Sequence, residues 1–156
     1  MHHPTTAKGD IGVALVTADL IRHGCIVMTP VSATCPYDLV IEFEGQMYRV
    51  QVKYRSIVKG RVEVKPQTAS SRFKTVQNKD FDVLAVYCPE INGVAYVAQE
   101  DFDKVLSLRV EPSKNNQKKN IILFQDKTQL NQATTNGYRK GTPRDEGTNG
   151  LRKKSP

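Results

Sequence analysis

The sequence has few of the side chains that build thiolate or imidazole metal sites, with three cysteines and three histidines among its 156 residues. Cys25, Cys35 and Cys88 are odd in number and lack the spacing of a zinc site or a redox motif, which argues against both classes and fits reduced thiols. No apolar run reaches the roughly 18 residues of a membrane span, and no signal-peptide segment follows Met1. We therefore expect a cytoplasmic protein with no membrane association.

Acidic residues are scarce in two stretches of this chain, whose formal net charge is +7. Residues 49–79 hold nine lysines and arginines against Glu63 alone, and residues 114–156 hold ten against three acidic residues. Two such blocks separated by an acidic stretch predict a polyanion-binding surface together with a basic arm. The alternative is a solvated face followed by a disordered tail, and charge alone leaves both open.

The first half of the chain predicts a helix followed by a meander of strands. Asp10 is suited to cap a helix that runs to about His23, with Gly24 at its C′ position. This helix is apolar nearly all round, so we expect it to be buried on more than one side, against a sheet or a second subunit. Alternating or short apolar runs predict strands at 25–29, 37–44, 47–56 and 61–65, with a turn at Glu44-Gly45-Gln46.

The second half begins with a polar, basic loop and continues with shorter elements. The mostly apolar run at 81–87 predicts a buried strand, and Asn92-Gly93 predicts a hairpin turn. The remaining expected elements are a strand at 94–98, a short helix at 100–106 and a last strand at 121–124.

Apolar residues nearly vanish after about Gln125. Such a segment buries too little surface to offset its ordering entropy, so we expect it to be disordered or to order only on a partner. The sequence thus predicts one α/β or α+β domain over residues 1–125 and a basic, flexible tail over 126–156.

Three polar residues of the second and third strands form a candidate site. Gln51 and Lys53 are two apart and project from the same sheet face, and the hairpin brings Asp38 opposite about position 52. Phosphodiester hydrolysis needs a divalent cation and a positive charge that stabilises the developing negative charge. In this interpretation Asp38 and Gln51 bind the metal and Lys53 orients water or stabilises the transition state. The alternative is a two-faced strand whose polar side meets solvent.

The order of these motifs resembles the PD-(D/E)XK nuclease family, and within it the bacterial homing endonucleases encoded in group I introns. The resemblance covers about residues 8–105, with the tail outside it. The segments that carry it are Lys8-Gly9-Asp10-Ile11-Gly12, Pro36-Tyr37-Asp38, the strand from Tyr48 to Arg55 that contains Gln51-Val52-Lys53, and the strand from Phe81 to Tyr87.

The resemblance implies a restriction-endonuclease-like core, an α/β fold in which helices flank a mixed β-sheet. It implies a double-strand DNA endonuclease that uses Mg²⁺, with Mn²⁺ as a substitute, held by Asp38, Gln51 and the backbone carbonyl of Val52. It further implies a homo-oligomer, a dimer of dimers, acting on a long pseudo-palindromic site. One site per chain agrees with this, because cutting both strands requires two sites.

Two residues depart from the family pattern. Gln51 stands where the family name specifies Asp or Glu, which costs the site one negative charge. Val13 stands where members with the Lys-Gly motif usually have a glutamate facing the metal, and valine ligates nothing. Asp10, about one helical turn earlier, is the nearest substitute. Reduced or absent cleavage is therefore expected if nothing compensates.

Positive charge on the strands and the following loop suggests how the chain holds DNA. A basic hairpin from Arg49 to Lys65 is expected to enter the major groove, and the loop from Ser70 to Lys74 to contact phosphates. Tail cations would add salt-dependent affinity. The DNA-binding candidates are Arg49, Arg55, Lys59, Arg61, Lys65, Ser70, Ser71, Arg72 and Lys74.

Three other functions remain open. A Holliday-junction resolvase shares the early helix and the motif that ends in lysine. A DNA-binding protein without cleavage is favoured by Val13 and Gln51. An RNA-binding module is the weakest, because the strands lack the aromatic stacking pattern of such sheets.

Overall fold

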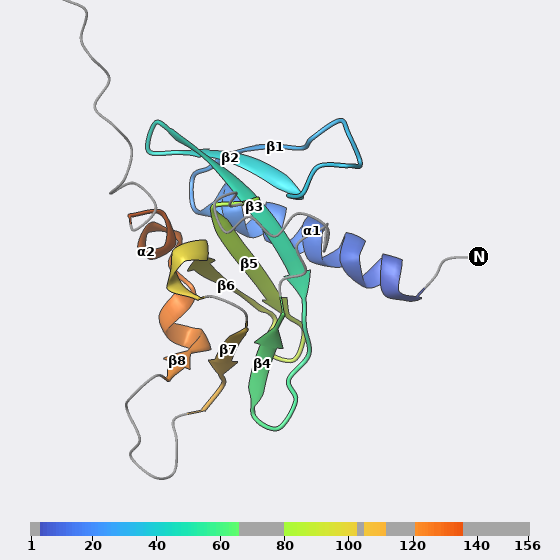
Figure 1. The fold of residues 1–156 in the computed structure, drawn as a ribbon, viewed down its shortest axis with the longest axis vertical. Helices are drawn as coiled ribbons and strands as arrows, with labels where there is room; N and C mark the ends of the chain where they lie inside the picture. The colour runs from blue at the N-terminus through green and yellow to red at the C-terminus, as the bar shows by residue number, and fades with distance from the viewer. Residues whose placement is uncertain (1–3, 66–79, 103–104, 112–120, 136–156) are drawn as a thin grey trace, which may run out of the picture.

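The structure is a computed structural model that describes residues 4–65, 80–102, 105–111 and 121–135. Its centre is a five-stranded sheet in the order β1-β2-β3-β5-β6 (Figure 1). β3 and β5 run parallel, whereas the other neighbours are antiparallel, so the expected α/β fold with a mixed sheet is confirmed. The strands are β1 (Ile26–Met28), β2 (Leu39–Phe43), β3 (Gln46–Tyr54), β5 (Val83–Cys88) and β6 (Gly93–Ala98).

One face of this sheet is covered by α1 (Pro4–Arg22), which lies across β3 and β5 (Figure 1). Its buried residues Val16 and Leu20 join a core with Leu39, Val50 and other inward residues of the strands. The opposite side of the helix stays open within this chain, since Ile11 and Leu15 are 48% and 37% exposed. Packing against the sheet thus buries one side of the helix, and contact of the other side with a second subunit stays a prediction.

A second, three-stranded sheet covers part of the other face. It consists of β4 (Arg61–Val64), β7 (Leu106–Arg109) and β8 (Ile122–Leu123), in the order β4-β7-β8. Val62, Val64, Leu106 and Leu108 point inward and form a second core with the central sheet.

The pairing of β4 corrects the expected ribbon from Arg49 to Lys65. β3 already pairs with β2 on one edge and β5 on the other, so it has no free edge for β4. β4 pairs antiparallel with β7 instead. A tight turn does lie at its start, where Lys59 and Gly60 both have positive φ and Val58 exchanges backbone hydrogen bonds with Arg61.

Two expectations for the second half are wrong. The described part of the expected helix at 100–106 is not α-helical, because residues up to Asp101 belong to a short 3-10 helix, η1 (Gln99–Asp101), and Leu106 already begins β7. The alternation of buried Leu106 and Leu108 with half-buried neighbours is the period of a strand. The described strand at the end is also shorter than expected, at Ile122–Leu123.

Ordered structure extends past residue 125. The 3-10 turn η2 (Phe124–Lys127) leads into α2 (Leu130–Thr135), and Leu130 and Ala133 are buried in the same core as α1. The expectation that apolar packing stops near Gln125 is therefore corrected at this short helix. The later tail cations, from Arg139 onward, lie outside the described residues.

The first helix starts earlier than the sequence predicted. The helix begins at Pro4, earlier than the expected Asp10, and proline is well suited to a first helical turn. It ends at Arg22, followed by Gly24 with a φ of 82°, as expected. No helix among the described residues is long and apolar enough to cross a membrane.

Gly12 sets how closely α1 approaches the site-bearing strand. A Cβ atom there would lie 3.4 Å from Tyr54 Cβ and 3.7 Å from Val52 Cγ1. We expect Gly12→Ala to be tolerated, because helix propensity favours alanine, and Gly12→Val to cost about 1–3 kcal/mol by overpacking. Urea unfolding of the two variants measures this difference. Equal stabilities would contradict the close approach.

Candidate active site

The Asp38 carboxylate is fixed at the point where β2 begins beside β3. The last register pair of these strands is Leu39 with Val50, one residue away. The backbone N–H of Asp38 donates to the Val50 carbonyl at 3.0 Å, and the N–H of Val52 donates to Asp38 Oδ2 at 2.6 Å. The carboxylate therefore lies against the Gln51-Val52-Lys53 segment, as the hairpin predicted.

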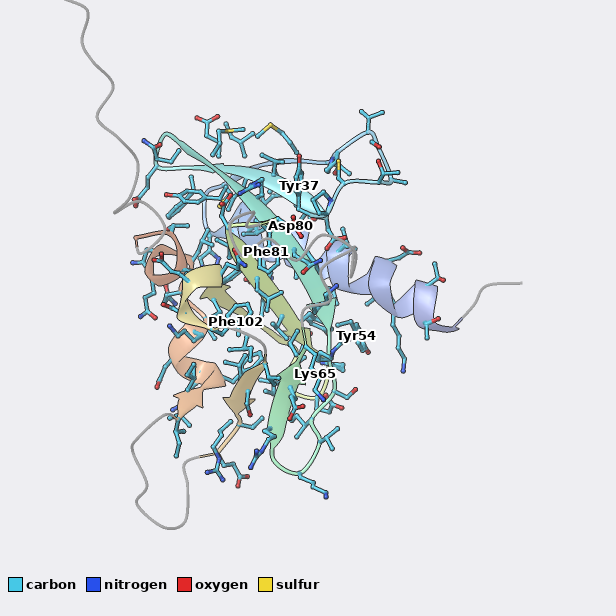
Figure 2. The ribbon with its side chains drawn as sticks, in the orientation of Figure 1. Tyr37, Tyr54, Lys65, Asp80, Phe81 and Phe102 are labelled. Carbon is cyan, nitrogen blue, oxygen red and sulfur yellow. The ribbon has the colours of Figure 1, made fainter. Side chains whose placement is uncertain are left out.

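The two residues before Asp38 are held in place by one packing contact and one hydrogen bond. Tyr37 packs against the second core, which contains Phe81, and Figure 2 shows the two rings in the same region near the start of β5. The carbonyl of Pro36 accepts a hydrogen bond from Gln51 Nε2 at 3.4 Å. The Pro36-Tyr37-Asp38 motif is thus tied to β3 at two of its three residues.

The Gln51 side chain presents an acceptor with no partner. Its Oε1 is buried and makes no hydrogen bond to any described residue, while its Nε2 is held by Pro36. An unpaired buried acceptor costs about 1–3 kcal/mol, so its retention calls for an explanation. Amide and carboxylate oxygens are ligands of hard divalent cations. Gln51 Oε1 and the Asp38 carboxylate, which accepts from the neighbouring Val52 N–H, are therefore oxygen atoms of the kind that could hold a metal ion.

Lys53 lies on the same side of β3 as Gln51 and is partly buried. Burial lowers its pKa below the usual lysine value, the Asp38 carboxylate raises it in part, and Arg55 lowers it further. The effect of the Asp38 carboxylate on the pKa of Lys53 agrees with their expected proximity. A partly desolvated ammonium beside a carboxylate can stabilise negative charge that develops nearby.

Further carboxylates do not gather here within the described part of the chain. No group of three or more His, Cys, Asp or Glu side chains there is arranged to hold a metal. Val13 packs against the α1-side core, and Asp10 is exposed on the first half of α1. Val13 has no atom that ligates a metal, and among the described residues Asp38 is the carboxylate that hydrogen-bonds to the Gln51-Val52-Lys53 segment.

An ion pair that the sequence did not predict lies next to this site. Arg49 Nε and Nη2 donate to the two carboxylate oxygens of Asp82 at 3.1 and 2.9 Å, and the Arg49 backbone N–H donates to Oδ2 at 2.8 Å. The Asp82 side chain raises the pKa of Arg49 through these hydrogen bonds, against the lowering effect of burial. This pair joins β3 to the start of β5, two residues before Gln51. The only signal in the sequence was an aspartate directly before a buried strand.

The DNA-binding candidates fall into separate groups. Arg49 is bound to Asp82, and Arg55 is half-buried, with Nη1 donating to the Tyr54 carbonyl at 3.0 Å. Lys59, Arg61 and Lys65 are exposed on the turn and outer face of the second sheet. Lys65 Nζ lies 3.8 Å from Glu63 Oε1. The candidates Ser70, Ser71, Arg72 and Lys74 lie outside the described residues.

Comparisons with known proteins bear on the family and the fold of this chain. A family model described as PD-(D/E)XK endonuclease matches residues 3–129. Among solved structures, the bacterial homing endonuclease I-Ssp6803I is similar, with a TM-score of 0.59 and 25% sequence identity over 74% of this chain and 84% of that chain. No curated protein matches the chain significantly.

Proposed function

Because the chain belongs to the PD-(D/E)XK endonuclease family and is an endodeoxyribonuclease, we propose that it is a sequence-specific homing endonuclease. It makes double-strand breaks in a long pseudo-palindromic site, and it is encoded within a group I intron. The similarity to a bacterial homing endonuclease supports this branch of the family. Its fold is the restriction-endonuclease-like core expected from the motifs.

The observation that carries the proposal is the buried, unpartnered Oε1 of Gln51 beside the Asp38 carboxylate and the Lys53 ammonium. A strand whose polar face simply met solvent would not bury an acceptor without a partner. The three groups converge on one end of the β2–β3 hairpin. Their chemistry is that of a phosphodiesterase with one carboxylate.

The family uses divalent metal ions, and we assign Mg²⁺ to this chain, with Mn²⁺ as a substitute. Asp38, Gln51 Oε1 and the Val52 carbonyl would hold the ion, and a bound ion would supply polarisation of the phosphate and a lower pKa of water. Lys53 orients the attacking water or stabilises the charge that develops on the phosphate oxygens. The Asp82–Arg49 pair keeps β3 in register with β5 and neutralises the Arg49 charge near the ligands.

Cutting both strands requires two copies of this one-site chain, and we propose a homo-oligomer, a dimer of dimers. The outward side of α1 supports contact with a second copy. Ile11 and Leu15 lie one turn apart on that side and remain substantially exposed.

A DNA-binding protein without cleavage is the second candidate, and Val13 is the observation that favours it. The Val13 side chain packs into the apolar core of α1 and the central sheet. If the metal needs a second carboxylate, this chain binds DNA and turns over slowly or not at all.

Incubation of supercoiled plasmids with the protein and Mg²⁺ tests the proposal, with EDTA as the control. The plasmids carry candidate intron-free target genes, and a four-way junction is offered in parallel. We expect linear product from a plasmid that holds the site, dependent on Mg²⁺ and faster in a Val13→Glu variant. Cleavage only by Val13→Glu would establish the second candidate, and preference for the junction would point to a resolvase.

A further inference from the structure

Two arginines face each other across the second sheet. Arg61 of β4 is the register partner of Arg109 of β7. The next pair along, Val62 with Leu108, is fully buried, so the two arginines share the outer face. The sequence alone made Arg61 a DNA-binding candidate. It did not predict the pairing with Arg109, because the two residues lie 48 positions apart.

The hydrogen-bond pattern brings these two side chains close together. The backbone N–H and carbonyl of Arg61 are bonded to Val58, on the side away from β7. The neighbouring N–H of Val110 donates to the Gly60 carbonyl at 3.1 Å. Arg61 and Arg109 are therefore a non-hydrogen-bonded pair, in which side chains of antiparallel strands approach most closely.

Opposed like charges destabilise a sheet unless something neutralises them. Arg109 Nε is buried and has no hydrogen-bond partner among the described residues. The carboxylate two residues along β4, Glu63, lies 3.8 Å from Lys65 Nζ. Glu111, two residues beyond Arg109, is exposed and follows the strand. The pair is thus short of an anion on the surface that the described residues present.

We propose that Arg61 and Arg109 together bind one backbone phosphate of duplex DNA, an inference that rests on the proposed function. Guanidinium groups bind phosphate through two parallel N–H donors, and two of them on adjacent strands surround one phosphate better than two lysines would. The contact is to the backbone, so it positions the duplex and reads no sequence. In this proposal Arg61 contacts a phosphate from the face of a sheet. It does not contact a base from a free two-stranded ribbon, as the sequence had predicted.

The pair lies within reach of the same duplex as the active site. Arg61 follows Lys53 by eight positions, so the two lie at most about 26 Å apart along the chain. This distance corresponds to about 8 base pairs of duplex. A long recognition site could therefore span both, and the turn at Lys59 and Gly60, which leads directly into Arg61, is exposed as well.

Binding to a 30-base-pair duplex of random sequence, followed by fluorescence anisotropy at several salt concentrations without Mg²⁺, tests the pair. Arg61→Gln, Arg109→Gln, the double variant and an Arg22→Gln control are compared. Arg22 is equally an arginine, but it is exposed at the end of α1 on the opposite side of the central sheet.

We expect each single variant of the pair to bind about tenfold or more weakly than wild type. The double variant should lose less than the product of the two single losses, because both side chains hold one phosphate. Its log–log salt slope should fall by about 0.9. Arg22→Gln should bind like wild type, and thermal unfolding should show all variants folded.

Other outcomes overturn the inference in separable ways. In one outcome the wild-type protein binds and cuts DNA while both arginine variants bind like Arg22→Gln. This result would overturn the proposed phosphate contact and leave the proposed function standing. Fully additive losses show two separate contacts and also overturn a shared phosphate. If the Arg61 and Arg109 variants unfold at lower temperatures but bind DNA like wild type, Glu63 or Glu111 neutralises the two arginines. Wild-type protein that neither binds nor cuts DNA overturns the proposed function together with the pair.

Discussion

Replacing Lys53 with alanine is expected to slow DNA cleavage by about 100- to 1000-fold while leaving DNA binding nearly intact. Loss of one positioned donor or charge that stabilises a transition state typically has this size. Lys53 is partly buried beside Asp38, so no solvent-exposed cation replaces it. Single-turnover cleavage with enzyme in excess over plasmid measures the chemical step apart from binding.

Arg22→Gln provides the matched loss of one positive charge away from the site and should cut at the wild-type rate. Equal slowing in both variants would show that net charge matters and would remove the specific role of Lys53. Wild-type cleavage by Lys53→Ala would place the active site elsewhere.

The pH dependence of cleavage gives Lys53 a second, independent signature. Burial lowers its pKa, so the folded protein loses this positive charge at a lower pH than an ordinary lysine, whose value is 10.5. Cleavage should therefore decline on the alkaline side below pH 10.5, as the stabilising ammonium is lost. In Lys53→Arg this decline should move to higher pH, because arginine stays protonated. If the decline at high pH is unchanged in Lys53→Arg, it is caused by the titration of another group.

Replacing Asp38 with asparagine is expected to reduce both divalent-metal affinity and cleavage by more than 100-fold. Substitutions of groups that merely orient metal ligands already cost 10- to 100-fold. Asparagine keeps the size of the side chain and an oxygen to accept the Val52 N–H, which donates at 2.6 Å. The hairpin should therefore persist while the charge is lost. Calorimetric titration with Mn²⁺ measures the affinity without relying on activity.

Two companion variants make the Asp38 result specific. Asp80→Asn removes a half-buried carboxylate before β5 and should leave metal affinity unchanged. Gln51→Glu restores the family carboxylate at the unpartnered Oε1 and should raise the affinity. Equal losses in Asp38→Asn and Asp80→Asn would indicate a diffuse electrostatic effect, and no change in Asp38→Asn would exclude it as a ligand.

The β2–β3 hairpin and its three polar residues could be predicted because every signal for them is local. Alternation along β3 assigns Gln51 and Lys53 to one face, and positive φ at Glu44 and Gly45 closes the turn. A two-residue turn then sets the register that brings Asp38 to Val52. The departures at Val13 and Gln51 were equally visible, because they are single positions in motifs of known order.

The strand β7 could not be predicted from the local sequence pattern. A short polar stretch with scattered leucines is compatible with a helix or a strand, and only burial against the central sheet selects the strand β7. The same holds for α2, whose six residues are too few to form a stable helix alone and are held by packing of Leu130 and Ala133.

By itself, then, the sequence determined the hairpin, the first helix and the family motifs, because these depend on neighbours along the chain and on short turns. The tertiary structure alone decided that β3 pairs in parallel with β5, that Asp82 binds Arg49, and that β4 leaves the site hairpin to join β7. Each of these joins residues more than 25 positions apart. Which strand edges remain free to pair is a property of the assembled sheet, and no local pattern of side chains encodes it.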